Sequence, residues 1–518
     1  MAGFVYTKAR GAAFVSQGDD MRLTQDRVDV VLGIDVGTQS SKCVVLDMSG
    51  DLRGKGQVGY GYQTPRPHWI EQNPEDWWNA VVGAVREALR QANLPSSRVR
   101  GIGLTGQMHG VVLLGQNLAP LRPAIIWMDR RSANLCEIVM DRVPRDVMAR
   151  AAGNRLSPGF AGASLAWLRE VEPHTLDQAR AALQPKDYIA LRLTGEIGSE
   201  PSDASATWLY DIARREWSPT LAGACGVPLD ILPPLAESSA VIGSLRADPA
   251  FTLGLPEGIP VVAGASDQAA LLLGAGVVES GRGAITLGTG GQLTVVSNRP
   301  WIDPELRLNT FCHAIPDHWY TMGAILNGGN ALRWWRSAAA TAASYAELLA
   351  GAASVPAGSD GLIFLPYLEG ERTPHMDPQA TGAFIGLTTR HTQAHLTRAV
   401  LEGVAFAFRD CLQILQAAGP APDHFLIGGG GSQGELWRRI LADVLGVSLQ
   451  TIEGAEHTAI GAAMLAGLGT HVFYDLPQAV ALSIRYGSTI MPDPDAHAIY
   501  TDAFARYQAF YPALRSVQ

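Results

Sequence analysis

One local design occurs twice in this chain, at widely separated places. In each copy, an apolar strand ends in a turn containing Gly-Thr, and a second apolar strand follows; the copies cover residues 29–47 and 284–296. Apolar runs around such turns predict β-hairpins. A repeat at this long spacing indicates two duplicated domains and not a solenoid of short units. We therefore expect a domain boundary between Asp267 and Gly283.

The length also requires more than one domain, because 518 residues exceed the size at which a single hydrophobic core stops growing. We divide the chain into a disordered N-terminal lead-in at 1–28, an N-terminal domain at 29–278 and a C-terminal domain at 279–518. The last helix is free to pack back on the first domain. Within the lead-in, Met21 is a candidate start of the protein.

Helix signals alternate with strand signals along the chain. Asn73 is a favourable N-cap, and Pro74 suits the first helical position. A second apolar helix is predicted at 398–418, where Gly419 and a proline end it. This alternation predicts an α/β fold, and a ligand is expected between the two domains.

Composition excludes several classes of protein. The net charge of −9 and the lack of a basic run argue against a nucleic-acid binder. Five single cysteines are typical of reduced thiols in the cytoplasm, and no apolar run is long enough to cross a bilayer. We expect a cytoplasmic protein that acts on a small molecule, without nucleic-acid or membrane partners. Homodimerisation is left open.

The two Gly-Thr turns are candidates for phosphate binding. Such turns expose backbone N–H groups and hydroxyls that bind phosphate oxygens, and Asp35 at a strand end can hold a magnesium ion. Either turn alone is equally explained as an ordinary hairpin. Two of them in one chain favour a pair of opposed phosphate clamps.

A third candidate is the strand, glycine loop and amphipathic helix over 425–445. Glycines let the backbone approach a nucleotide closely, and the helix start supplies donors. The glycines of 429–434, with Glu453 after the next strand, also match a dinucleotide-binding oxidoreductase. The same glycine pattern occurs at 101–106 with no helix after it, and this rival leaves both Gly-Thr turns unexplained.

Polar residues at other strand ends complete the candidate site. Asp267 follows the apolar run 259–262 and is either a general base for phosphoryl transfer or the N-cap of the next helix. His109, among glycines, either donates to a sugar hydroxyl or is a structural histidine. The polar stretch at 127–131 has two interpretations: its residues either shape a polar pocket or form a surface turn with one buried Trp. They are Trp127, Asp129, Arg130 and Arg131. No Walker motif occurs, which excludes an ordinary P-loop kinase.

The hairpin at Asp35, the Gly288-Thr289 loop and the Gly428 segment together resemble the ATPase fold of actin, hexokinase and heat-shock chaperones. Further stretches are similar to the FGGY carbohydrate kinases, from about Val31 to the C-terminus. They are Glu71-Gln-Asn-Pro-Glu-Asp-Trp-Trp78, Gly106-Gln-Met-His-Gly110, Pro185-Lys-Asp-Tyr188, Leu365-Pro-Tyr-Leu-Glu-Gly-Glu-Arg-Thr-Pro374 and Arg398-Ala-Val-Leu-Glu-Gly-Val404. The resemblance implies a two-domain, ribonuclease H-like fold with duplicated domains and a central cleft. The N-terminal domain would bind sugar and the C-terminal domain ATP.

Within that family, the Gly-Gln-Met-His-Gly and Pro-Lys-Asp-Tyr stretches are similar to xylulokinases. The resemblance implies ATP- and Mg²⁺-dependent phosphorylation of D-xylulose to D-xylulose 5-phosphate. Other family substrates (ribulose, gluconate or a polyol) are alternatives, because Gln268 stands where bacterial xylulokinases often have Asn. A sugar-independent actin-like ATPase is a rival that gives no role to Gln107, His109, Asp129 and Asp267.

The resemblance also implies roles for single residues. Asp267 would be the catalytic base, and Asp35 would be catalytic as the residue that positions the metal ion. The sugar-binding residues would be Gln107, Met108, His109, Asp267 and Gln268. The nucleotide-binding residues would be Gly37, Thr38, Gln39, Lys42, Gly288, Thr289 and Gly290, with Gly429, Gly430 and Gly431 beside the adenine.

Overall fold

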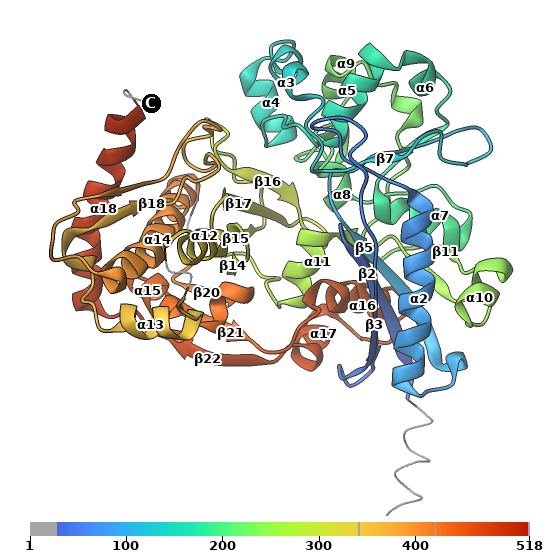
Figure 1. Cartoon of the computed structure of the whole chain (residues 1–518). Coiled ribbons are helices and arrows are strands. Elements are labelled where there is room, and N and C mark those ends of the chain that lie inside the picture. Colours follow the sequence, from blue (N-terminus) through green and yellow to red (C-terminus); the bar gives the residue numbers. More distant parts are fainter. Residues whose placement is uncertain (1–27, 340–341, 420, 516–518) are drawn as a thin grey trace, which may run out of the picture.

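The computed structural model describes residues 28–339, 342–419 and 421–515, arranged in two lobes (Figure 1). Of the predicted lead-in at 1–28, all but the last residue lies outside the described part, and so does Met21. Across the described residues, no helix is long and apolar enough to cross a membrane.

The first lobe is built on a mixed sheet with the strand order β11-β12-β5-β1-β2-β3, and β13 also pairs with β5. Strand β1 is antiparallel to β2 and parallel to β5. The strands are β1 (Val30–Val36), β2 (Ser40–Asp47), β3 (Leu52–Gly59), β5 (Val99–Gly106), β11 (Val241–Ser244), β12 (Pro260–Val262) and β13 (Ala265–Ser266).

The second lobe repeats this design in the order β16-β17-β15-β14-β20-β21-β22. Here β14 is antiparallel to β15 and parallel to β20, as β1 is to β2 and β5. The strands are β14 (Gly283–Leu287), β15 (Gly291–Ser297), β16 (Asn309–Cys312), β17 (Trp319–Ile325), β20 (His424–Gly428), β21 (Ser448–Ile452) and β22 (Tyr486–Ile490). Both predicted hairpins and the duplicated α/β architecture are confirmed.

Short strand pairs and helices are inserted between the strands of each sheet. The pairs are β4 (Glu71–Gln72) with β7 (Ala124–Ile125), β6 (Val112–Leu114) with β8 (Ala181–Leu183), β9 (Tyr210–Asp211) with β10 (Glu216–Trp217), and β18 (Ile363–Leu365) with β19 (Ala383–Ile385). A helical region at the top of the first lobe in Figure 1 contains α3 (Ala133–Met140), α4 (Arg145–Ala152), α5 (Ala161–Val171), α6 (Pro173–Asp177), α8 (Pro201–Ser205) and α9 (Pro219–Ala224).

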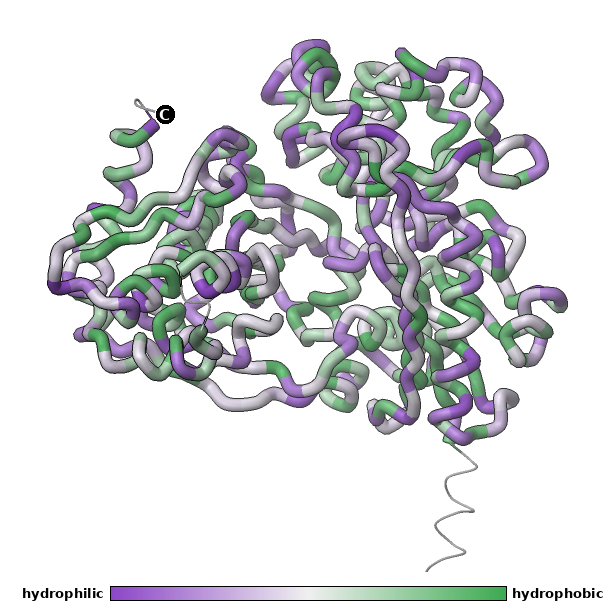
Figure 2. The backbone as a smooth tube through the Cα atoms, viewed as in Figure 1, coloured by the Kyte–Doolittle hydropathy of each residue, from purple (hydrophilic) through white to green (hydrophobic). Residues whose placement is uncertain are grey.

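Helices cover the first sheet on both faces. On one face lie α2 (Pro74–Ala92), α7 (Pro185–Thr194) and α10 (Ala247–Leu253); α11 (Asp267–Gly274) and α16 (His457–Gly469) lie on the other. The predicted start of α2 is confirmed, because the Asn73 side chain accepts from the Glu75 N–H. Along α2, polar and apolar residues alternate as expected for a helix with one buried face (Figure 2).

The second sheet packs on α14 (Gln393–Ala418), which begins before the predicted Arg398 because Thr392 caps it. The remaining helices of this half are α12 (Gly329–Ala339), α13 (Tyr345–Ala353), α15 (Glu435–Leu445), α17 (Leu476–Ser483) and α18 (Pro494–Arg515). The last helix, α18, packs on α15 and β18. The helix of the C-terminal half that returns to the first sheet is α16 instead.

Alternate residues along the strands of the second sheet belong to two different hydrophobic cores, and one of these cores is shared with the first lobe. Val295 of β15 belongs to the core around α14, whereas its neighbour Val296 packs in the core that contains α11 and α16. In β20, Phe425 and Leu426 divide in the same way. Because successive strand residues point to opposite faces, both faces of this sheet are buried.

Glycines allow α16 to lie directly on the first sheet. A Cβ atom on Gly33 of β1 would stand 1.9 Å from the Ala459 carbonyl oxygen, and one on Gly103 of β5 would stand 1.9 Å from that of Ala462. Both distances are far below a normal contact, so strand backbone touches helix backbone. Residues with side chains at these two positions would push α16 away from the sheet.

We expect Gly103→Ala to lower the free energy of unfolding by about 1–3 kcal/mol, because the added methyl group overpacks this contact. The matched control is Gly223→Ala in α9, where a Cβ meets no atom within 4 Å and alanine favours the helix. Urea denaturation of both variants and the parent measures the difference. Equal stabilities for the two variants would contradict the close contact.

Candidate active site

Three loops of the first lobe leave the sheet at the same edge. In register, Asp35 of β1 and Ala265 of β13 both pair with Thr105 of β5. The strands are parallel, so their carboxyl ends meet, and the residues that follow are brought together. The Gly-Thr turn after β1, residues 107–109 after β5 and Asp267 after β13 therefore adjoin one another.

Asp267 is the first residue of α11, and Ser266 occupies the N-cap position. The alternative that Asp267 is the N-cap is thus wrong. The Gln268 N–H donates to its Oδ1 over 2.8 Å, which orients the carboxyl group. Burial raises the pKa of Asp267 to about 7, and the nearby Asp35 adds to this rise.

Asp35 lies at the end of β1, beside its cross-strand partner Lys42. Burial raises the pKa of Asp35 to about 7; Lys42 opposes the rise and Glu456 adds to it. Lys42 donates to Glu456 over 2.7 Å, so its ammonium is already paired. The Asp35 Oδ1 atom is buried and has no partner among the described residues.

This unpaired carboxylate oxygen fits a magnesium ion. Mg²⁺ is usually held by one or two carboxylates together with phosphate oxygens and water, not by an all-protein cage. Consistently, the described residues contain no group of three or more His, Cys, Asp or Glu that could hold a metal ion. A cation beside Asp35 would also favour its ionised form.

The first Gly-Thr turn is held by side chains behind it, and its Gly37 N–H donates to the Ser40 carbonyl over 3.1 Å. The Thr38 carbonyl accepts from Gln72 Nε2 over 2.7 Å, and its Oγ1 accepts from Trp127 Nε1 over 2.9 Å. The backbone N–H groups of Thr38 and Gln39 donate to no described residue. The turn can therefore offer fixed backbone donors to an anion.

The second turn packs on the start of α12. The Gly288 carbonyl accepts from the Gly329 N–H over 2.7 Å, and the Thr289 carbonyl accepts from Gly328 and Asn330 over 2.9 and 3.0 Å. Our sequence analysis missed this supporting segment. Its signal was a Gly-Gly-Asn run at the start of an amphipathic helix.

The glycine loop after β20 lies next to this second turn, because Gly428 pairs with Thr286 of β14. Gly429 has a φ of +93°, and a Cβ on it would stand 2.6 Å from the Leu287 carbonyl oxygen. Cβ atoms on Gly428 and Gly430 would meet nothing within 4 Å. Gly429 and Gly431 thus pack inward on Leu287, and Gly428 and Gly430 present open backbone to a ligand.

His109 is held as a neutral hydrogen-bond acceptor. Its Nδ1 lies 2.6 Å from the Ala206 carbonyl oxygen, which can only accept, so the proton is on Nδ1. Its ring stacks on Phe160 at 4.1 Å, and burial lowers its pKa to about 4. The expectation that His109 donates to a sugar hydroxyl is therefore wrong for this geometry, since Nε2 carries the lone pair.

The two residues before His109 face different neighbours. Met108 is buried, and the Tyr320 hydroxyl from the second lobe lies 3.9 Å from its sulfur. Gln107 is also buried and donates to Gln72 Oε1 over 2.8 Å. Because Gln72 in turn holds Thr38, Gln107 supports the first Gly-Thr turn from behind.

The segment at 127–131 matches neither of its two interpretations. Asp129 and Arg131 are buried and paired over 2.8 Å, and Arg131 also reaches Glu71 over 2.8 Å. Its guanidinium stacks on Trp69 at 3.8 Å. Trp127 and Arg130 are the exposed members. The acid–base pair is therefore part of the core and is not open to a ligand.

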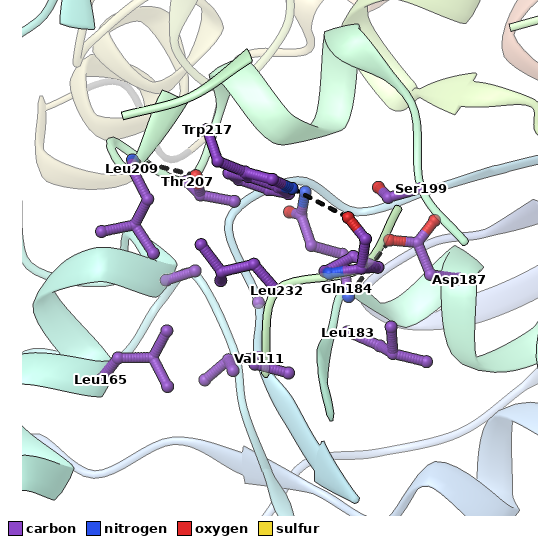
Figure 3. Close-up of a pocket in the computed structure, with 14 residues that line it drawn as sticks. Val111, Leu165, Leu183, Gln184, Asp187, Ser199, Thr207, Leu209, Trp217 and Leu232 are labelled. Atoms are coloured by element: carbon purple, nitrogen blue, oxygen red, sulfur yellow. Dashed lines mark hydrogen bonds between the residues drawn. The ribbon is translucent and has the colours of Figure 1, made fainter. Parts of the chain in front are cut away.

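A small pocket is lined by residues from Gly110 onward, directly after His109 in the chain. Figure 3 shows its lining side chains. Apolar side chains such as Val111, Leu165 and Trp217 line it together with Gln184 and Thr207. Its free space is about that of one water molecule, too little for a sugar. Gln184 Oε1 accepts from the His109 N–H over 2.9 Å, so this wall holds the histidine in place.

Two family models match the chain in tandem. Residues 30–274 match the N-terminal domain of the FGGY family of carbohydrate kinases, and residues 283–470 match its C-terminal domain. Xylulose kinase from Escherichia coli is 36% identical over 93% of this chain and 99% of its own. Gluconokinase from Bacillus subtilis is 30% identical over 93% and 94%. The crystal structure of xylulose kinase from Rhodospirillum rubrum superimposes with a TM-score of 0.89, at 32% identity over 94% and 99%.

These matches cover both lobes and the sheet edges that carry the candidate site. The chain therefore belongs to the FGGY family of carbohydrate kinases.

Proposed function

We propose that this carbohydrate kinase transfers the γ-phosphoryl group of ATP to the C5 hydroxyl of D-xylulose, with Asp267 as the general base. The observation that carries the proposal is the position of Asp267, at the edge where Asp35 and the Gly-Thr turn meet. The relatives named xylulose kinase support D-xylulose as the substrate.

Asp267 is suited to accept the hydroxyl proton. A general base is most effective when its pKa is near the working pH, and burial gives this carboxyl a pKa of about 7. The backbone N–H groups of Gln268 and Met108 donate to this carboxyl group and would hold it in a fixed orientation toward the substrate. His109 Nε2 would accept a hydrogen bond from a second sugar hydroxyl and so orient the carbon chain of the sugar.

The nucleotide would lie between the two Gly-Thr turns. The free N–H groups of Thr38 and Gln39 would bind the phosphates together with the Gly288-Thr289 turn. Gly430 would lie against the adenine ring. Asp35 would hold Mg²⁺, which neutralises phosphate charge when bound. The reaction requires positioning more than covalent chemistry, so rigid strand ends are an appropriate support.

The first test is ADP release with Mg·ATP across D-xylulose, D-ribulose, L-ribulose, glycerol and gluconate, with a sugar-free blank. We expect turnover to depend on sugar and to be highest with D-xylulose. Highest turnover with gluconate would show that the protein is a kinase whose preferred substrate is gluconate and not D-xylulose. Turnover equal to the blank with every sugar would overturn the proposal.

We expect Asp267→Asn to lower kcat by about 10²–10⁴-fold while ATP binding stays near that of the parent, since the amide cannot accept the proton. Steady-state kinetics and ATP titration measure the two effects. The matched control is Asp248→Asn, an exposed acid in the first turn of α10, which should keep parental kcat. Parental kcat in the Asp267 variant would remove it as the base.

The pH dependence of kcat/KM should show an acid limb. Below its pKa Asp267 is protonated and cannot act as a base, so activity should rise with pH and level off above about 7. The limb belongs to the Asp35–Asp267 pair jointly, because the two carboxyl groups interact. A profile that stays flat down to about pH 5 would argue against a base with a raised pKa.

A further inference from the structure

The Pro185-Lys-Asp-Tyr188 segment has no role in the proposed chemistry, yet it carries a fully buried lysine. Lys186 Nζ lies 2.6 Å from Asp187 Oδ1, 3.2 Å from Asp203 Oδ2 and 3.6 Å from Glu200 Oε1. None of these four side chains is more than 2% exposed. Buried charges are costly unless paired, so this cluster needs an explanation.

Glu200 is the most fully bonded member of the cluster. Its carboxylate accepts from the Ser202 N–H over 2.7 Å, the Ser202 Oγ–H over 2.8 Å, the Asp203 N–H over 2.8 Å and the Ser238 Oγ–H over 3.0 Å. An ionised carboxylate has about four acceptor positions, and all four partners are donors. Four hydrogen bonds therefore fill the acceptor positions of the Glu200 carboxylate.

Lys186 supplies the positive charge that this anion requires. Burial lowers the pKa of Lys186, but Asp187, Asp203 and Glu200 raise it by more, so the ammonium stays charged. Burial also raises the pKa of Asp203 well above its usual range.

Two arms connect Glu200 to the backbone that leads into Asp267. Ser202 Oγ accepts from the Ser266 N–H over 2.9 Å, and the Ser238 carbonyl accepts from the Gly264 N–H over 2.9 Å. Gly264 and Ser266 lie three residues and one residue before Asp267. The Glu200 carboxylate thus fixes, through two serines, both ends of the short segment that carries the base.

The bond direction at Ser202 depends on Glu200. A serine hydroxyl has one proton, and Ser202 donates it to Glu200. Its lone pairs then face the Ser266 N–H. Without an acceptor at Glu200 the hydroxyl is free to rotate, and the amide beside Asp267 loses its fixed partner.

We propose that Glu200, paired with Lys186, is a positioning residue that holds Asp267 in its reactive place through Ser202 and Ser238. The inference rests on the proposed function, because it takes Asp267 as the base. Glu200 touches neither sugar nor nucleotide; its effect is transmitted entirely through the 264–266 backbone.

The test compares Glu200→Gln and Ser202→Ala with Ser205→Ala. The glutamine keeps the shape but turns an NH₂ group toward donors, and Ser202→Ala removes only the connecting hydroxyl. Ser205 is the matched control: it lies on the same helix α8 and is equally buried. Its hydroxyl donates to the Ser202 carbonyl instead of a carboxylate. Like the Ser202 hydroxyl it accepts a backbone N–H, but that amide belongs to Cys312 of the second lobe.

We expect kcat to fall about 10- to 100-fold in Glu200→Gln and Ser202→Ala, with KM for both substrates near the parental values. Ser205→Ala should keep the parental kcat, and thermal unfolding of all variants separates stability from rate. If Glu200→Gln does not fold, Ser202→Ala decides alone. Parental kcat in a folded Ser202→Ala, or an equal loss in Ser205→Ala, would overturn the inference. A parent that is inactive with every sugar would instead overturn the proposed function.

Discussion

The site depends first on the contact of α16 with the first sheet, where helix backbone meets strand backbone at Gly33 and Gly103. This contact brings the start of α16, with Glu456, beside Lys42 and thus beside Asp35. Helix α11 packs on α16, and Asp267 is its first residue. A helix from the end of the chain therefore sets the position of both carboxyl groups.

The two lobes have the same strand order but different residues at the strand ends. In the first lobe the ends of β1 and β13 lead to the carboxyl groups of Asp35 and Asp267. Burial raises the pKa of each to about 7, and Asp35 adds to the rise at Asp267. In the second lobe the ends of β14 and β20 lead to glycines, two of which present open backbone. In the proposed reaction, proton transfer thus belongs to one copy of the design and nucleotide binding to the other.

Local patterns predicted the elements of this fold well. The hairpins, the Asn73 cap and the placement of Asp267 at a strand end needed only residues that are near one another in the sequence. Features that depend on partners distant in the sequence could not be predicted from local patterns. The tautomer and ring position of His109, for example, are set by the Ala206 carbonyl and by Phe160. For the same reason, the burial of Asp129 and Arg131 and the return of α16 to the first sheet were not foreseen.

The buried charges behind Asp267 are best understood as a means of positioning the backbone that leads into this residue. Removing a lysine and its carboxylates from water costs several kcal/mol per ion, and such clusters contribute little net stability compared with apolar side chains of the same volume. An apolar cluster at Lys186 and Glu200 would fill the space, but it would accept no hydrogen bond from Ser202 or Ser238. Only directional acceptors fix the 264–266 backbone to a few tenths of an ångström, the accuracy that a general base requires. In the proposed reaction, the free energy lost on burying the cluster would serve to hold Asp267 in position as the general base.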